Sequence, residues 1–134
     1  MKKMYLGCAI KNAPREFVDG VVALRQRIEE ELGFEILKFV DLTIEPRPSN
    51  EEIFLRDMEQ IANCDCMVAI CDEPSFGLGF EVRTALDLKK PVLMVATEGR
   101  VVSSFPQGVN LPGATFARYT SFDHLISLIK EHFS

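Results

Sequence analysis

The chain has 134 residues, of which 47% are hydrophobic and 26% are charged. This composition is typical of a globular protein and excludes a disordered or fibrous chain, so we expect residues 1–134 to form a single domain. The net charge is −5 and no cluster of Lys and Arg is present, which argues against a nucleic-acid polymer as partner.

The predicted elements alternate between strands and helices. Apolar runs predict strands at residues 4–10, 34–40, 66–71, 91–96 and 114–118. Apolar residues at three- and four-residue steps predict helices at 12–32, 49–63, 80–89 and 121–133, of which the first ends at Gly33 and the second begins with a capping box of Ser49 and Glu52. The pattern predicts a three-layer α/β fold, a Rossmann- or flavodoxin-like, doubly wound parallel sheet of about five strands.

The sequence also bears on location and cofactors. Its apolar runs, such as residues 66–71, are too short to cross a bilayer, and residues 5–10 are too short for a signal peptide, so we expect a cytoplasmic protein with no membrane partner. The four cysteines lie in or beside apolar segments without a neighbouring histidine. We interpret them as buried, reduced thiols, and we expect neither a metal site nor a cofactor.

The loops after the strands are where a ligand is expected, because open parallel sheets bind ligands at the carboxyl ends of their strands. The most informative loop is predicted to be a turn over residues 72–79, with a helix beginning at Phe80. Gly77 and Gly79 allow a tight turn and a close approach of the backbone to a ligand. The free N–H groups at the start of the following helix suit a phosphate or a carboxylate.

Two carboxylates are candidates for chemistry. Taken alone, Glu81 is explained as well by a favourable position in the first turn of a helix as by a catalytic role. Asp57 lies four residues from both Ile53 and Ile61, within an apolar arc, where an aspartate is costly unless it has a partner or a function. A hydrogen-bonded structural aspartate is the alternative; the functional interpretation places Asp57 beside Glu81 in the cleft.

Tyr5 in the first strand is either a core residue or a phenol that orients a catalytic carboxylate. The two histidines, His124 and His132, lie on the last predicted helix, away from the expected cleft, and are interpreted as surface residues. Any acid–base chemistry is therefore assigned to carboxylates.

These segments resemble the nucleoside 2-deoxyribosyltransferase-like superfamily, especially its 2'-deoxynucleoside 5'-monophosphate N-hydrolase branch. The resemblance covers nearly the whole chain, and its most specific motif is Pro-Ser-x-Gly-x-Gly-aromatic-Glu at residues 74–81. Supporting segments lie at residues 5–11, 57–65, 68–70, 90–93 and 99–103.

The resemblance implies a role for each candidate in cleaving a sugar–base bond. Glu81 attacks the anomeric carbon to form a glycosyl–enzyme, Asp57 helps to protonate the departing base, and Tyr5 holds Glu81. Ser75 favours a 5'-phosphate, because the transferases of free nucleosides have an aspartate at this position. Ser103 is expected to complete the phosphate site of a neighbouring subunit, which implies a homodimer or a dimer-based assembly. The implied substrate-binding residues are Cys8, Ala9, Ile10, Lys11, Ser75, Gly77, Gly79 and Ser103.

The chain departs from the hydrolase pattern in its first loop. Ala9 stands where that branch has a serine, and Lys11 stands where it has an arginine, so Lys11 offers a positive charge without the two-pronged hydrogen bonding of a guanidinium.

Three functions are considered for the chain: hydrolysis of a nucleoside 5'-monophosphate, exchange of bases by a deoxyribosyltransferase, or nucleotide binding without catalysis. The expected partner in each is a small-molecule nucleotide or nucleoside.

Overall fold

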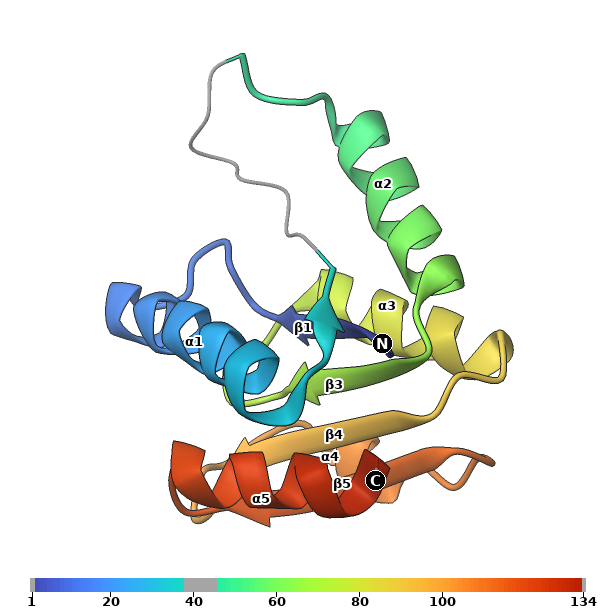
Figure 1. The fold of residues 1–134 in the computed structure, drawn as a ribbon. Coiled ribbons are helices and arrows are strands. Elements are labelled where there is room, and N and C mark those ends of the chain that lie inside the picture. Colours follow the sequence, from blue (N-terminus) through green and yellow to red (C-terminus); the bar gives the residue numbers. More distant parts are fainter. Residues whose placement is uncertain (1, 38–45, 134) are drawn as a thin grey trace.

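The computed structural model describes residues 2–37 and 46–133. Within these residues, five strands alternate with helices (Figure 1). The strands are β1 (Lys3–Cys8), β2 (Glu35–Ile36), β3 (Cys66–Ile70), β4 (Val92–Thr97) and β5 (Ala114–Tyr119). The helices are α1 (Arg15–Arg27), continued by the π-helical turn η1 (Ile28–Leu32), α2 (Asn50–Asn63), α3 (Phe76–Asp87), α4 (Ser104–Gly108) and α5 (Phe122–Phe133).

The five strands form one parallel sheet in the order β2-β1-β3-β4-β5. This order is the flavodoxin-like arrangement, in which the direction of winding reverses between β1 and β3. The predicted fold class is therefore confirmed. The reversal point matters for function, because the loops that leave β1 and β3 part there and open a crevice.

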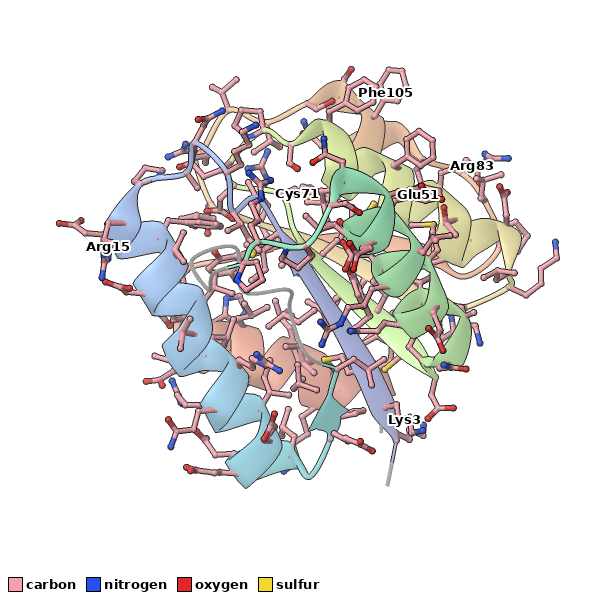
Figure 2. The ribbon with its side chains drawn as sticks, turned by 90° about the horizontal axis from the view of Figure 1, so that it is seen from above. Lys3, Arg15, Glu51, Cys71, Arg83 and Phe105 are labelled. Atoms are coloured by element: carbon pink, nitrogen blue, oxygen red, sulfur yellow. The ribbon has the colours of Figure 1, made fainter. Side chains whose placement is uncertain are left out.

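Helices cover both faces of the sheet, so the fold has three layers. On one face, the buried side chains of α1 and α5 pack with Met4, Leu6 and Cys8 of β1. On the other face, α2 and α3 pack on Tyr5 of β1 and on alternate residues of β3 and β4. In Figure 2, Arg15 of α1 and Arg83 of α3 lie on opposite sides of β1. The alternation along β1 thus points Tyr5 toward the helices that carry the candidate carboxylates.

Caps, a helix-ending glycine and a close helix–strand contact determine where the helices begin, end and pack. The predicted capping box is confirmed at α2, where the Glu52 N–H donates to Ser49 Oγ at 3.1 Å and the Ser49 N–H donates to Glu52 Oε1 at 3.1 Å. The predicted end at Gly33 is also confirmed, with φ at 75°. Gly7 lets α3 approach β1 closely, because a Cβ there would lie 2.7 Å from Cδ1 of Leu78.

Several predicted elements differ from those of the structure. The turn over residues 72–79 is too long, because α3 begins at Phe76, four residues before the predicted start. The strand predicted at 4–10 ends at Cys8, and α4 was not predicted at all. Of the strand predicted at 34–40, the structure describes only Glu35–Ile36 as strand; residues 38–45, with most of the predicted loop 41–49, lie outside the described residues.

The four cysteines are free thiols, of which Cys8, Cys64 and Cys66 are buried and Cys71 is half-buried. This agrees with their interpretation as small apolar side chains. Over residues 2–37 and 46–133, no helix is long and apolar enough to cross a membrane.

Candidate active site

The candidate site lies at the carboxyl ends of β1 and β3. These strands are neighbours, with Cys8 paired to Ile70, so the loops that follow them leave the same edge of the sheet. Two adjoining hollows open at this edge, and Gly77 borders both. We call the hollow that contains the carboxylates the carboxylate compartment and the other the loop compartment.

Glu81 and Tyr5 meet as the sequence interpretation required. The Tyr5 hydroxyl donates a hydrogen bond to Glu81 Oε2, although the two residues are 76 positions apart. Tyr5 is only 4% exposed, and its burial together with the nearby Glu81 charge raises the pKa of the phenol. The phenol therefore keeps its proton and acts as a donor to the carboxylate.

The environment of Glu81 is unusual for a carboxylate. Burial raises its pKa from 4.5 to about 7, the Tyr5 hydrogen bond opposes this rise, and the Asp57 charge adds to it. Because α3 begins at Phe76, Glu81 lies beyond the first turn, which contains no acidic residue. The interpretation of Glu81 as a helix-start acid is therefore wrong.

Asp57 reaches the same compartment from α2. The carboxylate compartment, about 230 Å³ in volume, is lined by Phe54, Asp57, Met58, Gly77, Phe80 and Glu81. Burial raises the pKa of the Asp57 carboxyl, and Arg56 opposes the rise. Over the described parts of the chain, no hydrogen bond to the Asp57 side chain is found, so the alternative of a hydrogen-bonded structural aspartate has no partner there. Two carboxyl groups in a mostly apolar hollow suit one proton donor and one nucleophile.

The loop compartment is larger, at about 460 Å³, and more polar. It is lined by Lys11, Asn12 and Ala13 after β1 and by Glu73, Pro74, Ser75, Phe76 and Gly77 after β3. Ser75 is the N-cap of α3, and its Oγ accepts the Leu78 N–H at 3.1 Å. The hydroxyl proton of Ser75 can still be donated to a ligand, and the N–H groups that open a helix have no intrahelical partner. This end of the crevice is suited to an anion.

Some predicted residues do not reach either compartment. Cys8 and Ala9 are buried beneath the site, where burial and the Glu81 charge raise the pKa of the Cys8 thiol to about 12. Ile10 and Gly79 line neither hollow. Gly77 and Gly79 are helical without positive φ, so their predicted role in a tight turn is wrong.

Ser103 is exposed and also lines neither compartment of its own chain. It caps α4, with its Oγ accepting the Phe105 N–H at 3.2 Å.

The sequence interpretation missed several lining residues. Phe54 and Met58 flank Asp57 in the sequence and form the apolar wall around it with Phe80. Asn12 has φ at 66°, a conformation that asparagine tolerates better than most residues, and this is the signal that could have placed it at a sharp bend beside the site. Glu73 gave no signal, because an acid in a loop is ordinarily solvated.

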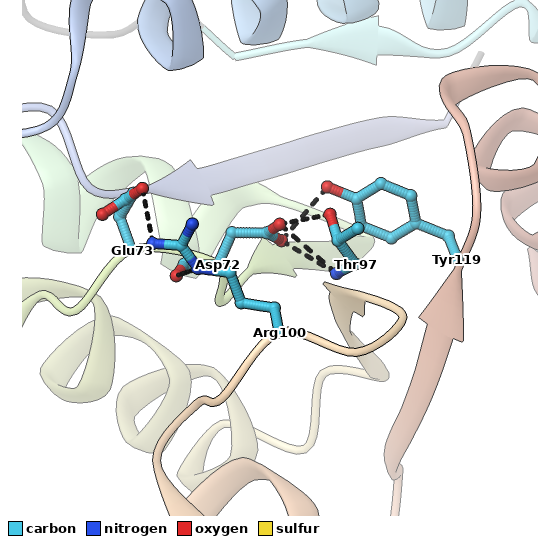
Figure 3. A network of polar contacts seen from close by, with 5 residues as sticks. All are labelled: Asp72, Glu73, Thr97, Arg100 and Tyr119. Carbon is cyan, nitrogen blue, oxygen red and sulfur yellow. Dashed lines mark hydrogen bonds and ion pairs between the residues drawn. The ribbon is translucent and has the colours of Figure 1, made fainter.

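A polar network around the buried Asp72 supports the loop after β3 (Figure 3). Asp72, 8% exposed, accepts hydrogen bonds from the Thr97 backbone N–H at 3.3 Å, from the Thr97 hydroxyl and from the Tyr119 hydroxyl at 3.1 Å. Arg100 Nε donates to the Asp72 carbonyl at 3.0 Å, and its Nη2 pairs with Glu73 Oε1 at 2.8 Å. The loops after β3 and β4 are thereby fastened together.

The chain is similar to known proteins over nearly its whole length. The chain is 30% identical over 129 residues to a Thermofilum pendens protein provisionally named 2'-deoxynucleoside 5'-phosphate N-hydrolase 1, covering 92% of this chain and 90% of that protein. The fold is shared with the Clostridium botulinum CMP N-glycosidase, with a TM-score of 0.70, 18% identity and coverage of 98% and 100%. It is also shared with a 2-deoxyribosyltransferase from Leishmania mexicana, with a TM-score of 0.67, 19% identity and full coverage of both chains. The model of the nucleoside 2-deoxyribosyltransferase family matches residues 5–112, and the chain belongs to this family of N-glycosidase and deoxyribosyltransferase enzymes.

Proposed function

We propose that the protein hydrolyses the N-glycosidic bond of a nucleoside 5'-monophosphate to a free base and a 5-phosphosugar. The observation that carries this proposal is the group formed by Tyr5, Glu81 and Asp57 at one end of a crevice whose other end is built for an anion. A nucleotide has this polarity, with its glycosidic bond and its phosphate at opposite ends of the sugar.

The reaction proceeds in two displacements on the anomeric carbon. The ionised Glu81 carboxylate forms a bond to this carbon as the bond to the base nitrogen breaks, and protonated Asp57 gives its proton to the departing base. A water molecule then attacks the same carbon, returns a proton to Asp57 and releases Glu81 as a carboxylate. The hydrogen bond from Tyr5 favours the ionised form of Glu81 that the first step needs.

The phosphate is assigned to the loop compartment. Lys11 supplies a positive charge, and the Ser75 hydroxyl and the first N–H groups of α3 supply donors. Ser103 is proposed to donate to the phosphate of a partner subunit in a homodimer; its exposure and its position outside its own crevice support this assignment.

The second candidate is a deoxyribosyltransferase, favoured by the match to the family of that name. It uses the same glycosyl–enzyme, which a second base intercepts in place of water. Nucleotide binding without catalysis is the third.

The test is to incubate the protein with ribo- and deoxyribonucleoside monophosphates and the matching nucleosides, and to follow free base by chromatography. Release without an acceptor base supports hydrolysis, whereas release only with an acceptor supports transfer. Saturable binding without turnover of any substrate identifies the binding module and contradicts both enzymatic proposals.

Ser75→Asp tests the phosphate assignment. Aspartate also caps helices, so α3 should keep its start while the added charge repels a phosphate. We expect the ratio of kcat/KM for nucleotide over nucleoside to fall by about tenfold or more. The control is Ser49→Asp, which makes the same change at the N-cap of α2, outside both compartments. An unchanged ratio in Ser75→Asp contradicts a phosphate contact at this position.

A further inference from the structure

We infer that the ion pair of Glu73 and Arg100 determines whether the loop compartment accepts a phosphorylated substrate. The inference deepens the proposed function and rests on its assignment of the phosphate to that compartment. It names a specificity-determining residue, Arg100, that does not itself line the compartment.

Glu73 is an acidic residue in the wall of the loop compartment, which is proposed to bind an anion. Glu73 lines the loop compartment with its side chain only 17% exposed, so solvent screens its charge poorly. Lys11 is the one basic side chain that lines the same hollow in the described chain. An uncompensated Glu73 would cancel the attraction of Lys11 for a phosphate, because the two side chains carry opposite unit charges.

Arg100 removes this conflict. Its Nη2 lies 2.8 Å from Glu73 Oε1, and its Nε donates to the Asp72 carbonyl at 3.0 Å, so the guanidinium bridges two consecutive residues of the loop after β3 (Figure 3). The pair turns the carboxylate into a nearly neutral group and leaves the charge of Lys11 to act on the ligand.

The backbone of Arg100 is held in place by β5. Arg118 Nη1 on β5 donates to the Arg100 carbonyl at 2.7 Å and to the Thr97 carbonyl at 3.0 Å. The Asp72 side chain is held by Thr97 and Tyr119. Arg100, whose side chain is 45% exposed, is thus held at its backbone carbonyl and at its guanidinium, so it loses less conformational freedom on pairing with Glu73 than an untethered surface arginine would.

The test separates the charge of Arg100 from its role as a tether. In Arg100→Ala, we expect the ratio of kcat/KM for nucleotide over nucleoside to fall by about tenfold, mainly through a higher KM for the nucleotide. Adding Glu73→Gln to Arg100→Ala removes the exposed charge and should restore the ratio to within about threefold of wild type. Arg100→Lys keeps the charge without the planar fork, and should retain more of the preference than Arg100→Ala.

Arg27→Ala is the matched control, because Arg27 is also an ion-paired arginine, bound to Glu31 and Asp123, and lines neither compartment. It should leave the ratio as in wild type. Two outcomes overturn the inference: an equal loss for nucleotide and nucleoside in Arg100→Ala, which makes Arg100 only a tether, or no rescue by Glu73→Gln.

A binding measurement distinguishes failure of this inference from failure of the proposed function. Calorimetric titration of wild type, Arg100→Ala and the double variant with ribose 5-phosphate and with ribose requires no turnover. Binding of ribose 5-phosphate that depends on Arg100 supports the inference even if no substrate is cleaved. If the three proteins bind ribose 5-phosphate equally, or if wild type does not bind it, the inference is wrong.

Discussion

Replacing Glu81 by glutamine should abolish activity and at the same time stabilise the fold above neutral pH. Glutamine has the shape of the glutamic acid side chain and stays neutral at every pH. It cannot form the glycosyl ester, so turnover should be lost. Its effect on stability follows from burial of the Glu81 carboxyl, which raises the pKa of this group to about 7.

The magnitude comes from the difference between the folded-state pKa of about 7 and the ordinary value of 4.5. A raised carboxyl pKa means that folding favours the protonated form, so the fold loses stability as pH rises from 4.5 through 7. The full difference corresponds to about 3 kcal/mol at pH 8. Because Glu81 is only partly enclosed, we discount this to about 2 kcal/mol, which corresponds to about 6 °C in Tm for a chain of this length.

The measurement is thermal and urea unfolding of wild type and Glu81→Gln at pH 4.5 and pH 8. The two proteins should have similar stability at pH 4.5, where both side chains are largely neutral, and the variant should be more stable at pH 8. Glu59→Gln is the control for loss of one exposed carboxylate from the same chain. A variant that is no more stable than wild type at pH 8 would refute the argument from burial.

Three further changes test neighbouring parts of the argument. Tyr5→Phe removes the hydrogen bond that lowers the Glu81 pKa, so the acid limb of the pH profile of kcat/KM should move to higher pH. Asp57→Asn removes a charge that raises this pKa, so the same limb should move to lower pH while kcat falls by about 100-fold or more through loss of the proton donor. If the acid limb stays at its wild-type pH in either variant, the assignment of this limb to Glu81 is wrong. Ser49→Ala breaks the capping box with Glu52 and should cost about 1 kcal/mol in urea unfolding; no loss would show that packing alone holds α2.

Much of the fold could be predicted from the sequence because its signals are local. The apolar run of β3, the capping box at Ser49 and the glycine at position 33 each determine their own segment. The start of α3 could not be predicted, because Gly77 and Gly79 each disfavour a helix by about 1 kcal/mol and indicate a turn. Packing of Leu78 against Gly7 and the cap from Ser75 support the helix there, and the first of these contacts lies 71 positions away in the chain.

In the candidate site, too, one contact could be predicted from the sequence and another could not. The meeting of Glu81 and Tyr5 could be expected once both were placed on a parallel sheet, since β1 and the helix after β3 are neighbours in that topology. The pairing of Glu73 with Arg100 could not, because it depends on the path of the loop after β4 and joins two polar residues of unremarkable spacing. Periodicity predicts which face of an element is buried, whereas it carries no information on how an irregular loop turns.

In the proposed reaction, Tyr5 has a more specific task than holding the nucleophile in place. Burial raises the pKa of both Glu81 and Asp57, and neighbouring carboxyl groups of this kind titrate together. The reaction requires the state in which Glu81 is ionised and Asp57 is protonated, whereas burial raises the pKa of Glu81 to about 7 and so disfavours its ionised form. The Tyr5 phenol donates to Glu81, while no hydrogen bond to Asp57 is found within residues 2–37 and 46–133, so the phenol favours the productive state. The direction in which Tyr5→Phe moves the pH profile therefore tests how the proton is distributed between the two carboxyl groups.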